Sequence, residues 1–335
     1  MRLLVTGGAG FIGSHFVRRQ LAKPTVSDAL GEEPDDDEHV VELTVFDALT
    51  YAGNKDNLAE VAGDPRYRFV HGDIADPDAV AKVVPGHDAI VNFAAESHVD
   101  RSIAGPAEFV RTNVLGTQVL LEAARAGDIG RFLQVSTDEV YGSISSGSWD
   151  ENSPLAPNSP YAASKAAADL VALAYARTYD LDVVLTRGSN TYGPRQHPDK
   201  LIPLFVTNLI EGRTVPLYGD GGNSRDWLHV DDHCRGIELA LLRGRSGAVY
   251  HVGGGTEPTN LELTNRLLEA MGAGPDRIEQ VQDRRGHDRR YALDSSRAEA
   301  ELGYVPRTPF ESGLAETVQW YRDNRPWWEL LKARR

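Results

Sequence analysis

The sequence is poor in cysteine and in long apolar runs. Cys234 is the single cysteine of the 335 residues, so no intrachain disulfide can form and packing must hold the fold. No apolar segment approaches the roughly 20 residues that span a bilayer, and we expect no contact with a membrane. The N-terminal apolar stretch is too short for a secretory signal and leads directly into glycines. We therefore expect a cytoplasmic protein.

Positive charge is also scarce. The chain has 35 Lys and Arg against 49 Asp and Glu, which gives a formal net charge of −14. Such a surface repels nucleic acid, because phosphate binding depends on clustered Lys and Arg. We predict no nucleic-acid partner and no metal site, and an anionic ligand must be met by local positive charge.

The first half of the chain alternates between β-branched runs and helical patterns. Most of the runs are continuously apolar, as in strands that are covered on both faces. This order predicts an α/β fold built on a doubly wound, parallel Rossmann sheet. The candidate strands are residues 2–7, 43–48, 67–73, 88–95, 131–137 and 182–187.

The pattern changes near residue 188 to Gly/Pro-rich loops and shorter helices. We predict a Rossmann domain over residues 1–187, with parts of 226–250 packing on it, and a smaller C-terminal α/β lobe over 188–335. The acidic stretch 31–39 is predicted to be a solvated, mobile loop without chemistry.

A glycine motif, "VTGGAGFIG", follows the first candidate strand and places Gly7, Gly10 and Gly13 before a helix that should start near Phe11. Glycines at this spacing allow a tight turn and a close approach to a pyrophosphate at the helix N-terminus. A glycine turn without a ligand is the alternative. The motif predicts a dinucleotide site.

Two acidic strand ends suit the adenosine half of that cofactor. Asp47, at the end of the second strand, is placed to bind the ribose, and a carboxylate there favours NAD over NADP. Its separation from Gly13 exceeds the usual ~20 residues because the acidic insertion lies between them. Asp73 and Ile74 are placed to cover the adenine, although an ordinary strand end explains them almost as well.

A Tyr/Lys pair lies in the alanine-rich segment "SPYAASKAAADLVALAYA". Tyr161 and Lys165 are four residues apart, which puts both side chains on one helical face. Tyrosine has an ordinary pKa near 10, so it needs neighbouring positive charge to act as a base. Lys165 and an oxidised nicotinamide could supply that charge. Such a pair is often only a solvated helix face, but after a dinucleotide turn it predicts redox chemistry.

Two adjacent carboxyl groups, Asp138 and Glu139, follow the strand 131–137 in "VSTDEVYG". Their charges should repel each other, which requires an explanation. An exposed acidic helix N-terminus, favoured by the helix dipole, is the plain alternative to a functional pair.

Together, "TGGAGFIG", the Tyr-x-x-x-Lys helix and the Ser-Thr strand end resemble the extended short-chain dehydrogenase/reductase family. Within it the chain resembles the nucleotide-sugar 4,6-dehydratases that act on dTDP-glucose, over nearly its whole length. The segments that carry this resemblance are "STDEVYG", "AAESHVDRS", "SNTYGPRQHPDKLIPLF", "PLYGDGGNSRDWLHVDDH" and "DRRGHDRRYALD".

The resemblance implies a lyase reaction. Bound NAD would take hydride from C4 of the glucose, water would leave across C5 and C6, and hydride would return to C6 to give dTDP-4-keto-6-deoxyglucose. Glu139 would remove the C5 proton while Asp138 protonates the C6 hydroxyl. These two roles require one carboxyl group to be ionised and the other to be protonated. Thr137 would bind the C4 oxygen beside Tyr161, and Lys165 would hold the nicotinamide ribose.

The same resemblance assigns the remaining contacts. Phe11, Ile12 and Ala94 would join the cofactor site. Arginines in the substrate site can clamp phosphate oxygens bidentately. For each substrate residue a plain surface role is an alternative, and Asn260 could instead be the N-cap of a helix. The substrate residues are Ser97, Asn190, Lys200, Leu201, Pro216, Tyr218, Arg225, Asn260, Arg284, His287 and Tyr291.

Two positions depart from the family pattern: Thr191 replaces an expected Asn, and Arg195 an expected aromatic residue. Three alternatives stay open: a UDP-glucose dehydratase, an NAD-dependent epimerase, and an NAD-responsive binding protein without turnover. An epimerase has no use for an acid/base pair at C5 and C6. The resemblance also implies a homodimer, formed by the Tyr161 helix and the helix near 106–125, although alanines allow close helix packing within a monomer too.

Overall fold

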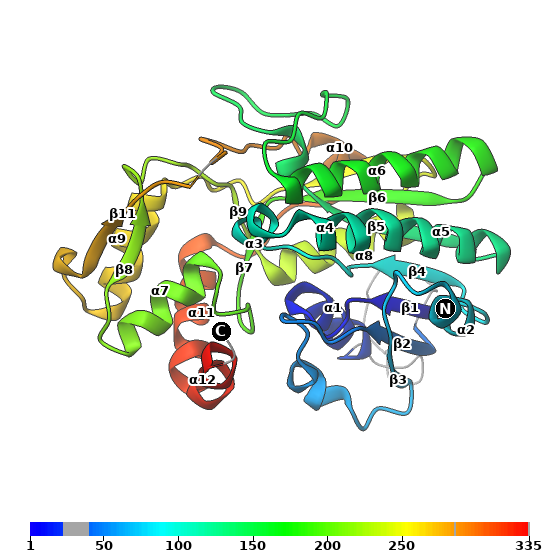
Figure 1. The fold of residues 1–335 in the computed structure, drawn as a ribbon, viewed down its shortest axis with the longest axis horizontal. Helices are drawn as coiled ribbons and strands as arrows, with labels where there is room; N and C mark the ends of the chain where they lie inside the picture. The colour runs from blue at the N-terminus through cyan, green and yellow to red at the C-terminus, as the bar shows by residue number, and fades with distance from the viewer. Residues whose placement is uncertain (23–39, 285, 334–335) are drawn as a thin grey trace.

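A computed structural model describes residues 1–22, 40–284 and 286–333; the predicted loop at 31–39 lies outside them. A seven-stranded sheet has the order β10-β6-β5-β4-β1-β2-β3, with every neighbouring pair parallel (Figure 1). The doubly wound Rossmann prediction is confirmed. The strands are β1 (Arg2–Thr6), β2 (Glu42–Asp47), β3 (Tyr67–His71), β4 (Ala89–Asn92), β5 (Arg131–Thr137), β6 (Val183–Gly188) and β10 (Val249–Val252).

Helices cover both faces of this sheet, which explains why its central strands are continuously apolar. Two separate hydrophobic cores lie on the two faces. One face packs against α1 (Phe11–Ala22), α8 (Val230–Arg243) and α10 (Ser296–Leu302). The other packs against α2 (Pro77–Val83), α5 (Thr117–Ala126) and α6 (Pro160–Tyr179).

The sheet is not built from the first half of the chain alone. The strand β10 pairs with β6, and α8 and α10 pack on the same sheet. The sequence analysis missed β10, because four residues after a Gly/Pro-rich region give little periodicity. The domain boundary at residue 187 stays a prediction.

A second group of elements has its own hydrophobic core and lies to the left in Figure 1. Its helices are α7 (Leu201–Ile210), α9 (Asn260–Met271), α11 (Phe310–Asp323) and α12 (Arg325–Ala333). Its two small parallel sheets pair β8 (Val215–Tyr218) with β11 (Ile278–Val281), and β7 (Asn190–Tyr192) with β9 (Trp227–His229).

Local signals explain several helix starts. The predicted start of α1 at Phe11 is confirmed. The N-cap of α9 is Thr259, which forms a capping box with Glu262, so the N-cap interpretation of Asn260 is wrong. The shorter helical segments are η1 (Lys55–Val61), α3 (Val99–Ala104), α4 (Pro106–Phe109), η2 (Val110–Gly116), η3 (Asp138–Tyr141) and η4 (Pro275–Arg277). Among the described residues, no helix combines the length and the apolar character needed to cross a membrane.

A buried polar network joins the sheet to α6. Arg187 Nε on β6 donates to Asp169 Oδ2 on α6 over 2.9 Å, and its Nη1 donates to the Tyr141 hydroxyl over 2.5 Å. Tyr141 contacts His251 Nε2 on β10 at 2.6 Å. Burial lowers the pKa of His251 to about 3, so this ring is neutral and its Nε2 accepts a hydrogen bond from the Tyr141 hydroxyl. The network ties four elements together behind the carboxyl ends of β5 and β6.

We expect Asp169→Ala to lower the free energy of unfolding by about 3–5 kcal/mol, because it leaves the buried Arg187 guanidinium without its carboxylate. Asp182→Ala is the matched control. It breaks the pair with Arg131 at the opposite end of the same two strands, where both side chains are partly exposed, and should cost about 1 kcal/mol or less. Urea unfolding measures both values, and equal losses would contradict the ranking.

Candidate active site

The carboxyl ends of the sheet strands open onto one cavity of about 350 Å³. It lies where the strand order reverses between β1 and β4, the usual ligand crevice of a doubly wound sheet. Its wall contains every predicted cofactor contact and every predicted catalytic residue. These are Gly7, Gly10, Phe11, Ile12, Gly13, Asp47, Asp73, Ile74, Ala94, Thr137, Asp138, Glu139, Tyr161 and Lys165.

The glycine turn between β1 and α1 is close-packed in a way that only glycine permits. A Cβ atom on Gly7, where φ is +65°, would lie 2.5 Å from the Ala94 nitrogen, and one on Gly13 would lie 2.4 Å from the Gly7 oxygen. The Gly10 amide donates to that same oxygen over 3.1 Å. The turn therefore sits tightly against β4 and borders the cavity at the start of α1, which fits a dinucleotide pyrophosphate.

Asp47 lies beside this turn at the end of β2. Its Oδ2 accepts from the Ala9 amide over 2.9 Å, and its Oδ1 accepts from the Leu49 amide over 2.7 Å. Burial raises the pKa of Asp47, and the two amide donors oppose that shift. Each carboxylate oxygen retains a lone pair, so the residue can still accept ribose hydroxyl groups.

Asp73 and Ile74 form the next part of the wall, after β3. Asp73 Oδ1 accepts from the Ala75 amide over 2.8 Å, and its Oδ2 pairs with Arg111 Nη2 at 2.7 Å. Ile74 is buried and lines the cavity. These contacts hold an apolar side chain at the end of the sheet, where a flat adenine ring could pack.

The short helix η3 fixes the two adjacent carboxyl groups. Thr137 is the last residue of β5 and the N-cap of η3, and its Oγ1 accepts from the Glu139 amide over 3.3 Å. The same hydroxyl donates to Asp138 Oδ1 over 3.2 Å, and Tyr161 lines the cavity beside it. Strand, cap and tight turn thus place a hydroxyl, two carboxyls and a phenol around one point.

The two carboxyl groups have different electrostatic surroundings. Burial raises the pKa of Asp138 well above its usual range, and the charges of Glu139 and Asp226 raise it further. Among the described residues, Asp138 Oδ2 has no hydrogen-bond partner. Burial also raises the pKa of Glu139, but three cations oppose that shift: Arg284, Arg225 and Lys200. Asp138 is therefore the neutral acid, and Glu139 ionises more readily.

The helix α6 supplies Tyr161 and Lys165. It begins where Ser159 Oγ accepts from the Ala162 amide over 3.1 Å. Lys165 Nζ donates to the Val135 oxygen on β5 over 2.7 Å, and burial lowers its pKa from 10.5 to about 8. The charged lysine thus reduces stability below about pH 8, a cost that disappears as the pH rises toward 10.5. Burial and the charge of Glu139 raise the pKa of Tyr161 well above 10, so its phenol is protonated in the free protein.

Three predicted substrate residues line the same cavity: Ser97, Asn190 and Lys200. Lys200 Nζ, at the start of α7, donates to the Ser97 oxygen over 2.9 Å and so bridges the two groups of elements. Asn190 Oδ1 is buried and lacks a hydrogen-bond partner within the described part of the chain. It is free to accept a hydrogen bond from a ligand.

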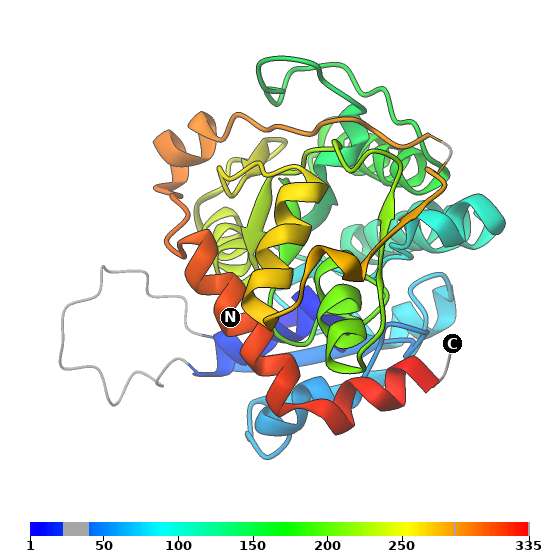
Figure 2. The same ribbon diagram turned by 90° about the vertical axis from the view of Figure 1, so that its left-hand side faces the viewer.

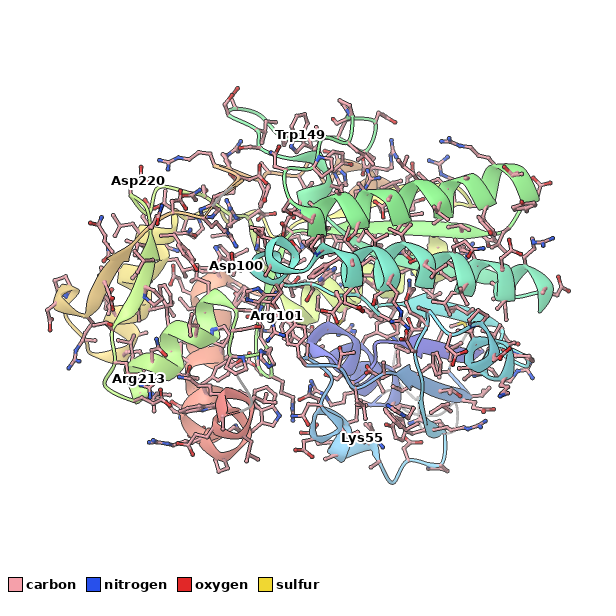
Figure 3. All side chains as sticks on the ribbon, viewed as in Figure 1. Lys55, Asp100, Arg101, Trp149, Arg213 and Asp220 are labelled. Atoms are coloured by element: carbon pink, nitrogen blue, oxygen red, sulfur yellow. The ribbon has the colours of Figure 1, made fainter. Side chains whose placement is uncertain are left out.

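Arg225, Arg284 and Tyr291 lie outside the cavity wall but close to the carboxyl pair. The Arg225 guanidinium stacks on the Tyr291 ring at 4.3 Å, and both residues interact electrostatically with Glu139. Arg284 Nη1 lies 3.8 Å from Asp100 Oδ1. Figure 3 shows the labelled Asp100 between the large sheet and the second group of elements.

The other predicted substrate residues, Leu201, Pro216, Tyr218, Asn260 and His287, do not line the cavity. Tyr218 is surrounded by Arg284, whose guanidinium lies 5.9 Å from its ring, and by His287, whose ring lies 6.2 Å away. His287 Nδ1 also pairs with Asp283 Oδ1 at 2.6 Å. Residues from two separate segments of the chain, Tyr218 in one and Arg284 and His287 in the other, thus form a partly basic cluster on the second lobe.

The sequence analysis missed a second set of lining residues. The loop 50–54 follows β2, so the rule that ligands bind at the carboxyl ends of strands could have found it. Asn57, Trp327 and Leu331 had no local signal, because they reach the cavity only through tertiary packing. The further missed residues include Glu96, His197 and His233.

The two departures from the family pattern both lie in the wall. Thr191 Oγ1 contacts His233 Nδ1 at 2.7 Å. Arg195 has a φ of +68° and forms a short ion pair with Glu60 on η1. The substitutions therefore change contacts at the cavity edge and leave the carboxyl pair and α6 intact.

Comparison with known proteins agrees with this geometry. The family model for GDP-mannose 4,6 dehydratase matches residues 4–317. A dTDP-glucose 4,6-dehydratase of Streptomyces niveus is 61% identical over 333 residues, covering 99% of this chain and 96% of the relative. The crystal structure of DesIV, a dTDP-glucose 4,6-dehydratase of Streptomyces venezuelae with NAD bound, is 62% identical, has a TM-score of 0.93, and is matched over 99% of this chain and 100% of that one.

A more distant solved structure is the UDP-glucose 4-epimerase of Thermotoga maritima, with 30% identity, a TM-score of 0.86, and coverage of 97% of this chain and 100% of that one. Fold alone therefore does not separate dehydratases from epimerases, whereas identity does. The chain belongs to the GDP-mannose 4,6 dehydratase family, and within that family it groups with the dTDP-glucose 4,6-dehydratases.

Proposed function

We propose that the protein converts dTDP-glucose to dTDP-4-keto-6-deoxyglucose with NAD as a bound cofactor. The observation that carries this proposal is the unequal pair at the end of β5. Asp138 is buried and held neutral, while Glu139 beside it faces three cations. An elimination needs an acid and a base at neighbouring carbons, and this pair supplies one of each.

The residues around the C4 hydroxyl would start the reaction. NAD, when bound, accepts the hydride from C4 and later returns it to C6. Thr137 and Tyr161 both line the cavity and would hold the C4 oxygen between them. Tyr161 is protonated in the free protein, so positive charge beside it is needed before it can take the hydroxyl proton. Lys165 would hold the nicotinamide ribose from the same helix face.

The carboxyl pair would then perform the elimination. Glu139 removes the C5 proton, which the C4 ketone has made acidic, and Asp138 gives its proton to the departing C6 hydroxyl, so that water leaves. When hydride reaches C6, Glu139 returns its proton to C5. The unpartnered Asp138 Oδ2 is a suitable place for the transferable proton.

The second lobe would bind the nucleoside diphosphate. Lys200, Arg225 and Arg284 give local positive charge within a protein of net charge −14. Tyr218 and His287 lie beside Arg284, where a base could pack. Leu201, Pro216, Asn260 and Tyr291 stay predicted substrate contacts.

The first test offers the purified protein dTDP-glucose and UDP-glucose that carry deuterium at C4. We expect loss of one water from the dTDP sugar and migration of the deuterium to the new methyl group, measured by mass spectrometry. Preference for UDP-glucose would support the alternative dehydratase, and a change of configuration at C4 without loss of water would support an epimerase.

Glu139→Gln tests the base. Because the amide cannot take the C5 proton, we expect kcat to fall by about 10²–10⁴-fold while C4 oxidation continues. Reduced nicotinamide should therefore accumulate on the enzyme and be visible in its absorbance spectrum. Asp150→Asn changes an exposed carboxyl in the following loop and should leave both signals unchanged. Loss of turnover without reduced nicotinamide would show that Glu139 acts earlier than elimination.

We also propose a homodimer formed by α6 and the helices before it. Five large apolar side chains of α3, η2 and α6 are exposed: Ile103, Val110, Leu115, Leu170 and Tyr179. Figure 1 shows α5 and α6 running side by side along one side of the molecule, where they pack against each other. A second copy would cover these side chains. Cytoplasmic location and the absence of a nucleic-acid partner stay predictions from the sequence.

Leu170→Glu should shift the protein from dimer to monomer. Leu170 is 58% exposed at the centre of α6, so a glutamate there would leave the monomer intact but would place a charge in the proposed interface. Leu330→Glu on α12 is the matched control, since Leu330 is 60% exposed away from this face. Sedimentation equilibrium measures both masses. A wild-type monomer, or a Leu170→Glu dimer, would refute this interface.

A further inference from the structure

The C-terminal helix α12 forms part of the wall of the cofactor cavity. Trp327 and Leu331 line the cavity together with Asn57 of η1, 270 residues away from Trp327 in the chain. Figure 2 shows the red C-terminal helix beside the blue segment that follows β2, and Figure 3 marks the start of η1 with Lys55. The two helices meet on the side of the cavity next to the glycine turn.

A chain of hydrogen bonds runs from α12 to that turn. Trp327 Nε1 donates to Asn57 Oδ1 over 3.1 Å, and Asn57 Nδ2 donates to the Ala9 oxygen over 3.0 Å. The Ala9 amide in turn donates to Asp47 Oδ2 over 2.9 Å. Asn57 and Ala9 are both buried, so these hydrogen bonds lie within the protein and not on its outer surface.

The direction of this chain of bonds is fixed by chemistry. An indole N–H can only donate, so Trp327 requires the oxygen of the Asn57 amide to face it. That leaves the Asn57 NH₂ group facing Ala9, which is the orientation its carbonyl needs. The Ala9 oxygen, which also accepts from the Asn54 amide over 3.0 Å, requires the same orientation. Loss of the indole donor would therefore remove one of the two hydrogen bonds that hold the Asn57 amide in place.

Ala9 is the residue between Gly8 and Gly10. The orientation of its peptide groups therefore influences the direction of the backbone amides that would face a pyrophosphate. The same residue also holds Asp47, which is placed to bind the ribose. A turn that is already ordered loses less conformational freedom when the ligand binds. The orientation of the Asn57 side-chain amide should therefore affect the affinity for the dinucleotide.

A second contact joins η1 to the loop after β7, not to α12, and it is weaker. Arg195 pairs with Glu60 on η1, and the Glu60 side chain is 62% exposed. Exposed ion pairs contribute roughly 0–1 kcal/mol and are screened by salt. Of these two contacts, the buried chain through Asn57 is therefore the stronger constraint on the turn.

We propose that Trp327, acting through Asn57, is a positioning residue for the dinucleotide: the C-terminal helix holds the glycine turn in its binding conformation. The proposal rests on the proposed NAD site. It adds to that site the helix α12, which lies outside all of the cofactor motifs. It assigns α12 a role in cofactor retention, which a reaction that returns its hydride to the same substrate requires.

Trp327→Phe tests this role, because it removes the indole donor and retains an aromatic ring. Loss of one such hydrogen bond should weaken NAD binding by about 2–10-fold, measured by calorimetry on cofactor-free protein. The KM for the nucleotide sugar at saturating NAD should not change. Trp328→Phe is the matched control on the same helix. Its Nε1 donates to the Tyr321 oxygen over 2.8 Å, so the variant should lower the melting temperature without changing NAD affinity.

Asn57→Ala separates positioning from general destabilisation. If the chain of bonds acts through Asn57, adding Trp327→Phe to Asn57→Ala should weaken NAD binding no further. Additive losses, or equal NAD affinity in Trp327→Phe and wild type, would overturn the proposal. A wild-type protein that binds no NAD at all would overturn the proposed function as well. Failure of the proposed function can therefore be distinguished from failure of the positioning role alone.

Discussion

The burial of two adjacent carboxyl groups at the end of β5 is the constraint on which this site depends. Asp138 and Glu139 cannot both be charged at low cost where both are shielded from solvent, so their environments must differ. The sheet and η3 provide the burial, and the second lobe provides the cations that favour an ionised Glu139. Neither part alone would produce an acid and a base from two neighbouring carboxyls.

Parallel strand pairing explains why one cavity receives so many functional groups. All strands of the large sheet point the same way, so their carboxyl ends bring Gly7, Asp47, Asp73 and Thr137 to one edge. The helix α6 then adds Tyr161 and Lys165 across the end of β5. The buried Arg187–Asp169 pair lies behind these groups and fixes α6 against β6.

Much of the first-lobe site could be predicted because each signal is local. A glycine spacing, a strand-end acid and an i, i+4 pair each depend on a few consecutive residues, and all of them line the cavity. The substrate residues were harder, because Tyr218, Arg284 and His287 meet only through loops with no periodicity. The positions of Asn57 and Trp327 could not be predicted at all, since their contact joins segments 270 residues apart.

The sequence by itself determined the fold class and the glycine turn, because both follow from patterns of neighbouring residues, and it predicted which side chains would react. The family resemblance had already proposed Asp138 as the acid and Glu139 as the base, but only the tertiary structure supplies a physical reason for that division, because it depends on burial and on cations from another part of the chain. It also decided that β10 completes the sheet and that α12 reaches the cofactor cavity, since both are long-range contacts that no local pattern encodes.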